Sequence, residues 1–179
     1  MDTILFDTET TGLLKPQISK ISAQPYIIEI YACRIDDNFK LVGEYEAYIK
    51  PPIELSEEIT RITGITETDL KDAKPFIHHI KPLQELFLGV EKMVAHNLPF
   101  DRSMLANELV REDMILNFPW PSKHICTVEK SLPLFGHRLS LAKLHQALFN
   151  KDFKDAHRAK NDVYALVRCY KEMINQGLI

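Results

Sequence analysis

The chain has 179 residues, of which 45% are apolar and 26% are charged. This composition is typical of one globular domain, and it excludes a disordered tail and a disulfide-stapled miniprotein. The N-terminus is acidic, and no apolar run approaches the roughly 20 residues of a membrane span, which excludes a signal peptide and a membrane anchor. We therefore expect one domain over residues 1–179 that is soluble, cytoplasmic and independent of membranes.

The net charge of −3 is spread unevenly along the chain. Residues 1–119 carry 12 Lys+Arg against 20 Asp+Glu, and residues 120–179 carry 10 against 5. The basic C-terminal third suits a polyanionic partner, although ordinary solvated helix faces would give the same pattern. The acidic total argues against tight non-specific binding of duplex nucleic acid, because such binding needs many phosphate contacts.

The first half of the chain shows mainly strand patterns. A short apolar run over 3–6 is followed directly by the turn-prone string DTETTG. The runs over 26–35 and 41–49 flank turn residues and predict an antiparallel hairpin. Ser56 and Gly64 are a typical start and stop of a helix.

The second half alternates between helical and strand patterns. Pro82 is expected to break or kink the first of its helices, and Asp101 should lie near the N-terminus of the next. A hairpin followed by alternating strands and helices predicts the α/β class, a mixed sheet with helices packed on its faces. The expected elements of this half are a helix over 76–90, a strand over 92–95, a helix from 101, a strand over 124–127 and helices over 140–149 and 156–176.

Four acids are candidate metal ligands. Asp7 and Glu9 follow the first apolar run two residues apart, which places both side chains on one face of a strand. Taken singly, this pair could be exposed turn acids, Asp101 a helix cap and Asp162 a surface residue. If the four converge, a divalent cation must cancel their repulsion, and all-oxygen ligation favours Mg²⁺ or Mn²⁺ over Zn²⁺.

His157 precedes Asp162 by five residues. On one continuous helix the two side chains would be about 140° apart, so they share a face only if His157 belongs to the segment that leads into the helix. From there a neutral imidazole can reach the acids and accept a proton from a water. A surface histidine in a basic stretch is the alternative. His96 is expected to order its own loop.

Three motifs resemble those of the DEDDh (DnaQ-like) 3'-5' exonucleases, the family of the proofreading epsilon subunit of bacterial DNA polymerase III. They are DTETTG from Asp7, HNLPFD ending at Asp101 and HRAKND from His157 to Asp162. The stretches IIEIYA (27–32) and ITGIT (62–66) fit the same family in order and spacing, so the resemblance extends over 4–170. It implies an RNase H-like fold, a mixed five-stranded sheet flanked by helices, with the second strand antiparallel.

The resemblance also implies an enzyme that hydrolyses phosphodiesters from the 3' end of single-stranded or frayed DNA and releases nucleoside 5'-monophosphates. Two divalent cations, Mg²⁺ or Mn²⁺, would be held by Asp7, Glu9, Asp101 and Asp162, and His157 would be the general base. Arg158 stands where the related subclass has a tyrosine, which places the chain in the His subclass. By the same resemblance, the terminal nucleotide would contact Thr8, Thr10, Gly12, Leu13, Thr63, Asn97 and Phe100.

Two other functions remain open from the sequence. The first is an RNA-directed 3'-5' exoribonuclease on the same fold, because contacts to the 2'-OH cannot be read from sequence. The second is a non-catalytic module that binds nucleic acid or a polymerase. We expect nucleic acid, DNA in preference to RNA, as the partner. We expect no stable polymerase partner, because the 17 residues after Asp162 are needed by the last helix.

Overall fold

The computed structural model describes residues 2–152 and 158–179. Five strands form one sheet in the order β3-β2-β1-β4-β5. Strand β2 is antiparallel to β1 and β3, whereas β1, β4 and β5 run parallel. The mixed sheet with an antiparallel second strand is confirmed. The strands are β1 Thr3–Thr10, β2 Ile27–Ile35, β3 Leu41–Tyr48, β4 Lys92–Ala95 and β5 Lys123–Cys126.

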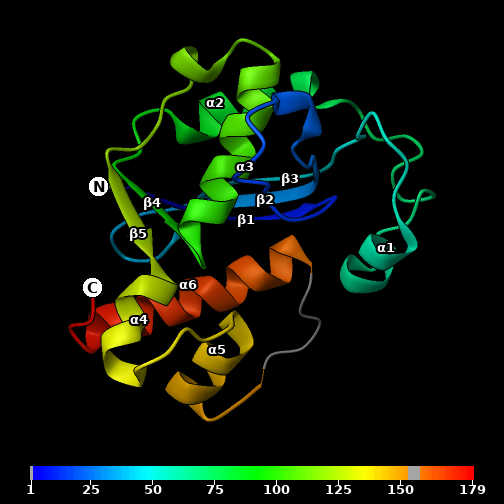
Figure 1. Ribbon diagram of the computed structural model, residues 1–179. Helices are drawn as coiled ribbons and strands as arrows, with labels where there is room; N and C mark the ends of the chain where they lie inside the picture. Colours follow the sequence, from blue (N-terminus) through cyan, green and yellow to red (C-terminus); the bar gives the residue numbers. More distant parts are fainter. Residues whose placement is uncertain (1, 153–157) are drawn as a thin grey trace.

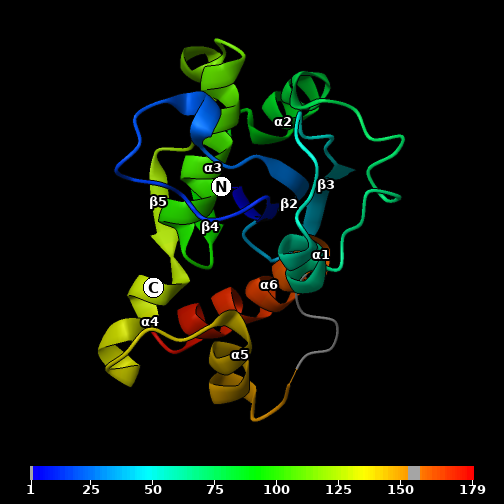
Figure 2. The same cartoon turned by 45° about the vertical axis from the view of Figure 1, so that its right-hand side comes forward.

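Helices cover both faces of this sheet. Figure 1 shows α2 and α3 on one face and α5 and α6 on the other, while α1 stands outside both layers beside the strand ends (Figure 2). In the described part of the chain, no helix combines the length and apolar character needed to cross a bilayer. The helices are α1 Glu57–Thr63, α2 Ile80–Phe87, α3 Leu98–Arg111, α4 Thr127–Phe135, α5 Leu141–Phe149 and α6 Ala159–Asn175, with 3₁₀ turns at η1 Ile21–Ala23, η2 Phe76–His79 and η3 Ile115–Asn117.

Side-chain alternation along β1 divides the core into two layers. Ile4 and Phe6 pack with the cluster of α2 and α3, and the Phe6 ring lies edge-on to Phe87 with centroids 6.0 Å apart. Leu5 points the other way, into the cluster of α5 and α6. Because successive side chains of a strand face opposite sides, residues farther along β1 are directed alternately toward these two helical layers.

Strand β1 is longer than the sequence predicts. The string DTETTG is turn-prone and only its two acids were expected on a strand face, but β1 continues to Thr10 because Asp7 pairs with Tyr31 and Glu9 with Glu29 of β2. Burial in the sheet outweighs the local turn preference. The acids therefore belong to a central strand, whose position is held by neighbours on both sides.

Two helical segments also differ from expectation. The pattern over 76–90 divides into η2 and α2, and Pro82 stands in the first turn of α2, where its missing N–H has no partner in the helix. Helix α4, which contains Pro133, was not predicted. Buried Val128 and Ser131 hold α4 against the protein while Pro133 stays exposed. The expected start of the last helix at 156 lies outside the described residues.

Candidate active site

Asp7, Glu9 and Asp162 meet where β1 passes the start of α6. Asp7 and Glu9 continue the row of Leu5 toward the layer of α5 and α6, and Asp162 stands in the first turn of α6. One carboxylate oxygen from each residue lies within 4.8 Å of the other two. Three of the four predicted ligands are thus close enough to hold one metal ion.

Asp101 reaches the same place from the opposite helical layer. Thr8 lies between the two acids of β1 and points toward α3, where its N–H (3.1 Å) and hydroxyl (2.8 Å) both donate to Asp101 Oδ1. Asp101 is buried and lies in the first turn of α3. It lines a cavity of about 300 Å³ together with Asp7, Glu9 and Asp162. All four predicted acids therefore face one cavity.

The surroundings of these acids disfavour their charged forms. Burial, with repulsion from the neighbouring carboxylates, raises the pKa of Asp7 well above its ordinary value and that of Glu9 to about 8. Burial also raises the pKa of Asp101 to about 7, although the hydrogen bonds from Thr8 oppose the shift. A cluster of oxygen ligands whose charges repel one another fits a hard divalent cation.

Of the two histidines in the motifs, the structure describes His96 but not His157. His96 lines the acid cavity, with Nδ1 2.9 Å from Thr127 Oγ1 and Nε2 3.0 Å from the carbonyl oxygen of Leu139. The carbonyl requires a proton on Nε2, and burial lowers the pKa of His96 to about 4, so His96 is neutral and ties its loop to the start of α4 and to the connection between α4 and α5. His157 lies outside the described residues, and its role as general base stays a prediction.

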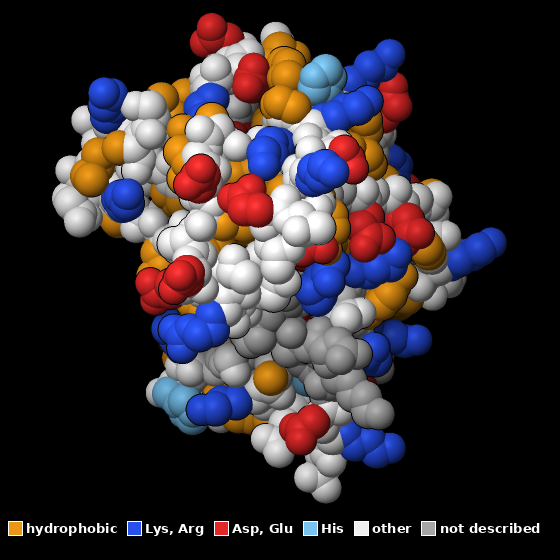
Figure 3. Space-filling model, turned by 90° about the vertical axis from the view of Figure 1, so that its right-hand side faces the viewer, with side chains coloured by type: hydrophobic (Ala, Val, Ile, Leu, Met, Phe, Trp, Pro, Cys, Tyr) orange, Lys and Arg blue, Asp and Glu red, His pale blue; other side chains and the backbone are white. Residues whose placement is uncertain are grey.

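A groove of about 660 Å³ adjoins the acid cavity. It runs between α1 and the segment from Thr8 to Lys15, and the exposed side chain of Leu13 lies at its surface. On the face that carries α1, acidic and basic side chains are interspersed (Figure 3). Six residues predicted to contact the terminal nucleotide line the groove, namely Thr8, Thr10, Gly12, Leu13, Thr63 and Phe100.

Asn97, the seventh of these residues, is not among the residues that line the groove. It precedes α3 in a left-handed conformation with φ 71°. Its side-chain oxygen accepts a hydrogen bond from Arg138 Nη2 at 2.9 Å.

The chain matches a known protein family over most of its length. Residues 4–170 match the family described as Exonuclease (RNase_T). The chain belongs to this exonuclease family. The PolC-type DNA polymerase III of Caldanaerobacter subterraneus subsp. tengcongensis is 33% identical over 178 residues, 97% of this chain and 12% of the polymerase. That of Thermotoga petrophila is 31% identical over 172 residues, 96% of this chain and 12% of the polymerase. The chain thus spans about an eighth of these relatives.

Solved structures agree with the expected fold of this exonuclease. The nuclease domain of 3'hExo, a DEDDh family member, bound to rAMP, superposes with a TM-score of 0.78 at 16% identity and covers 99% of this chain and 93% of that one. Exonuclease X in complex with 5' overhanging duplex DNA gives 0.68 at 24% identity, with 98% and 93% covered. The RNase H-like fold of the DEDDh exonucleases is confirmed.

A fifth carboxylate lies close to these acids, that of Glu29, which was not predicted from the sequence. It is buried in β2 opposite Glu9, and its oxygens accept hydrogen bonds from Arg158 Nη2 (3.0 Å) and from the N–H of Ala159 (3.2 Å). Arg158 also donates to the Tyr48 hydroxyl. Glu29 therefore ties β2 to the start of α6, the helix that carries Asp162. An acid inside the apolar stretch IIEIYA was the available signal.

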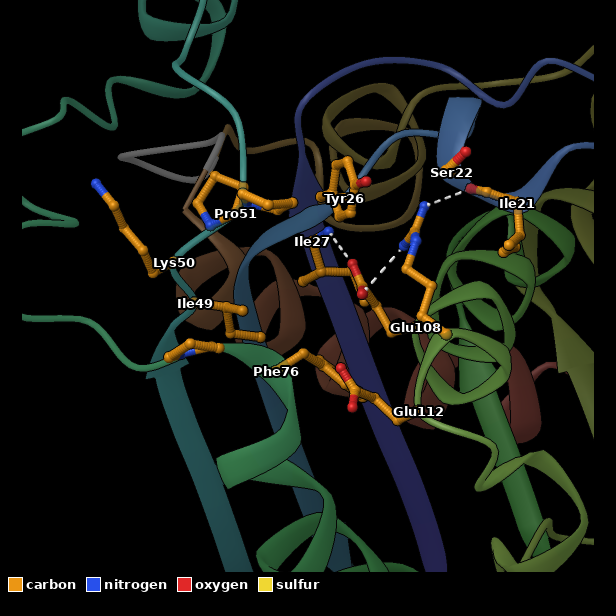
Figure 4. Close-up of a pocket in the computed structure, with 13 residues that line it drawn as sticks. Ile21, Ser22, Tyr26, Ile27, Ile49, Lys50, Pro51, Phe76, Glu108 and Glu112 are labelled. Atoms are coloured by element: carbon orange, nitrogen blue, oxygen red, sulfur yellow. Dashed lines mark hydrogen bonds and ion pairs between the residues drawn. The ribbon is translucent and has the colours of Figure 1, made fainter.

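A second cavity, of about 550 Å³, lies on the side of α3 (Figure 4). Glu108 points between the N–H of Ile27, which donates to it at 2.8 Å, and Arg111, which pairs with it at 3.0 Å. Arg111 also donates to the carbonyl oxygens of Ile21, Gln24 and Pro25. These bonds anchor the polar segment 15–25, which begins beside the groove.

Proposed function

We propose that this exonuclease removes nucleoside 5'-monophosphates from the 3' end of single-stranded or frayed DNA in a metal-dependent reaction. One observation carries the proposal: four carboxylates share a cavity that adjoins a groove of about 660 Å³, a volume suited to a small ligand such as a nucleotide. The acid cavity and the groove share Thr8, Glu9 and Phe100, so a nucleotide in the groove would have its phosphate beside the acids.

The acids have the chemistry that Mg²⁺ or Mn²⁺ requires. Asp7, Glu9 and Asp162 would hold one ion, and Asp7 with Asp101 a second. Two such ions supply Lewis-acid stabilisation of the attacking and leaving oxygens in phosphodiester hydrolysis.

The protein's own groups would position the substrate and move the proton. Thr8 holds Asp101 by two hydrogen bonds and fixes its direction toward the cavity. His157 would accept the proton of the attacking water, as its place in HRAKND indicates. Leu13 and Phe100, which both line the groove, would stack on the terminal base.

Similarity to PolC-type DNA polymerases supports DNA as the substrate. RNA is the second candidate, because one structure of the same fold shows a 3'-exonuclease that recognises the 3' end of a histone mRNA stem-loop. The choice depends on how the groove treats the 2'-OH of the last nucleotide.

Incubation of 5'-labelled single-stranded DNA and RNA with the protein and Mg²⁺, Mn²⁺ or EDTA tests the proposal. We expect a ladder of shortened DNA with either ion and none with EDTA. Faster shortening of RNA would select the second candidate, and intact strands of both kinds under every condition would contradict exonuclease activity.

A further inference from the structure

Arg138 is an exposed residue of the connection between α4 and α5, close in the chain to residues that line the acid cavity. The residue after it, Leu139, accepts the hydrogen bond from His96, and the next three residues, 140–142, line the cavity. Its positive charge, after the larger effect of burial, contributes to the lowered pKa of His96. The guanidinium therefore acts electrostatically on a residue of the cavity itself.

The direction of this side chain is fixed by Asn97. The bond from Arg138 Nη2 to Asn97 Oδ1 is 2.9 Å long, and Asn97 is itself held between His96 and the start of α3. The acceptor is a neutral amide, so this hydrogen bond does not neutralise the positive charge of the guanidinium. In contrast, Arg111 is paired with Glu108, and Arg158 with Glu29.

The positions of the acid cavity and the groove suggest the direction in which a nucleic-acid strand would run across the site. Beyond the residues that they share, the groove is bounded by α1, and the acid cavity by the start of α5. If the last nucleotide lies in the groove and its phosphate at the acids, the preceding part of the strand leaves past the start of α5. Arg138 lies two residues before Ser140, the first residue of this segment that lines the acid cavity, and a guanidinium is well suited to contact a phosphate.

We propose that Arg138, oriented by Asn97, binds a backbone phosphate upstream of the scissile bond. Asn97 is then a positioning residue that acts through Arg138, in place of the contact with the terminal nucleotide expected from the motif. This inference rests on the proposed exonuclease function.

The test combines binding and kinetics on the full chain. Binding of a fluorescein-labelled oligo-dT strand is measured by anisotropy with Ca²⁺ over a series of salt concentrations, and its hydrolysis is measured with Mn²⁺. We expect R138A to raise Kd and KM about tenfold, the size of one charged hydrogen bond, with a much smaller change in kcat. The slope of log Kd against log salt should fall by about 0.7, one phosphate contact on a single strand.

Three further variants separate phosphate binding from a structural effect. R138K keeps the charge and should restore the salt slope. N97A should raise Kd by less than R138A does, and the double variant N97A/R138A should bind no more weakly than R138A alone. K81A removes an exposed charge from α2, in the other helical layer, and should change neither constant.

Unchanged Kd, KM and salt slope in R138A would overturn the phosphate contact while leaving the exonuclease function intact. Additive losses in the double variant would overturn the positioning role of Asn97. A wild-type chain that neither binds nor shortens the strand would overturn both the inference and the proposed function.

Discussion

Glu29 and Arg158 form an ion pair, 3.0 Å long, that joins β2 to the start of α6. The Glu29 side chain is 3% exposed and that of Arg158 is 44% exposed, so the two side chains differ in their access to water. Freed from its partner, Arg158 can turn to water, whereas Glu29 is left buried beside other carboxylates.

We therefore expect R158A to destabilise the fold more than E29Q does. Loss of Arg158 leaves a buried carboxylate unpaired and should lower the free energy of unfolding by about 2 kcal/mol. E29Q keeps an acceptor for the N–H of Ala159 and should cost about half as much. Urea denaturation measures both. K160A, which breaks an exposed pair with Glu46, is the control and should cost less than about 0.5 kcal/mol. Equal losses for R158A and E29Q would contradict this asymmetry.

The acid cavity makes the stability of the metal-free protein depend on pH. The folded-state pKa values of Glu9, about 8, and Asp101, about 7, lie above the unfolded values of about 4. A raised carboxyl pKa stabilises the fold below the unfolded value, and this contribution is lost as pH rises through the folded one. In EDTA, we expect the free energy of unfolding to fall between about pH 5 and pH 8.

A matched measurement isolates the two groups. E9Q and D101N should flatten this pH dependence, and the rise in Tm on adding Mn²⁺ to the wild type should grow with pH, because the ion competes with protons for the carboxylates. A stability of the metal-free wild type that does not change over this range would contradict the raised pKa values.

His157→Ala should separate proton transfer from metal binding. We expect the rate of hydrolysis to fall by about 10²-fold or more, the usual size of a general-base effect. The affinity for Mn²⁺ should change little by titration calorimetry. Loss of metal affinity in this variant would identify His157 as a ligand instead.

The groove predicts a preference for unpaired ends. Stacking of the terminal base on Leu13 and Phe100 requires that the base leave its partner, which a mismatched end does at lower cost. Primers with a mismatched 3' end should be shortened faster than matched primers. L13A should reduce the rate on single strands, and equal rates on the two primers would count against the stacking role.

Part of the fold could be predicted because local chemistry and the tertiary structure agree. Ser56 accepts a hydrogen bond from the N–H of Ile59, and Gly64 ends α1 at φ 72°, as the sequence indicates. The hairpin of β2 and β3 likewise follows from alternating residues on either side of a turn. Such signals lie within a few residues of one another and do not depend on distant contacts.

Other features depend on contacts between distant segments. Pairing with β2 converts the DTET string into strand, and burial of Val128 maintains a helix despite Pro133. The motif places Asn97 near a nucleotide, but only the position of Arg138, 41 residues away, shows what its side chain accepts. The four acids were predicted as one group from their motifs, and β1, α3 and α6 bring them to one cavity.

The proposed 3'-5' exonuclease activity is tested most directly with one DNA strand, labelled at its 3' end or at its 5' end, and incubated with Mn²⁺ and the wild type, D7A or D162A. We expect the wild type to release the 3' label at once as a mononucleotide and to shorten the 5'-labelled strand stepwise. D7A and D162A, which remove several kcal/mol of transition-state stabilisation, should be slower by about a thousandfold or more. E85A, an acid on α2, should match the wild type. Early release of the 5' label, or full activity in D7A, would contradict a 3'-5' exonuclease activity that depends on these acids.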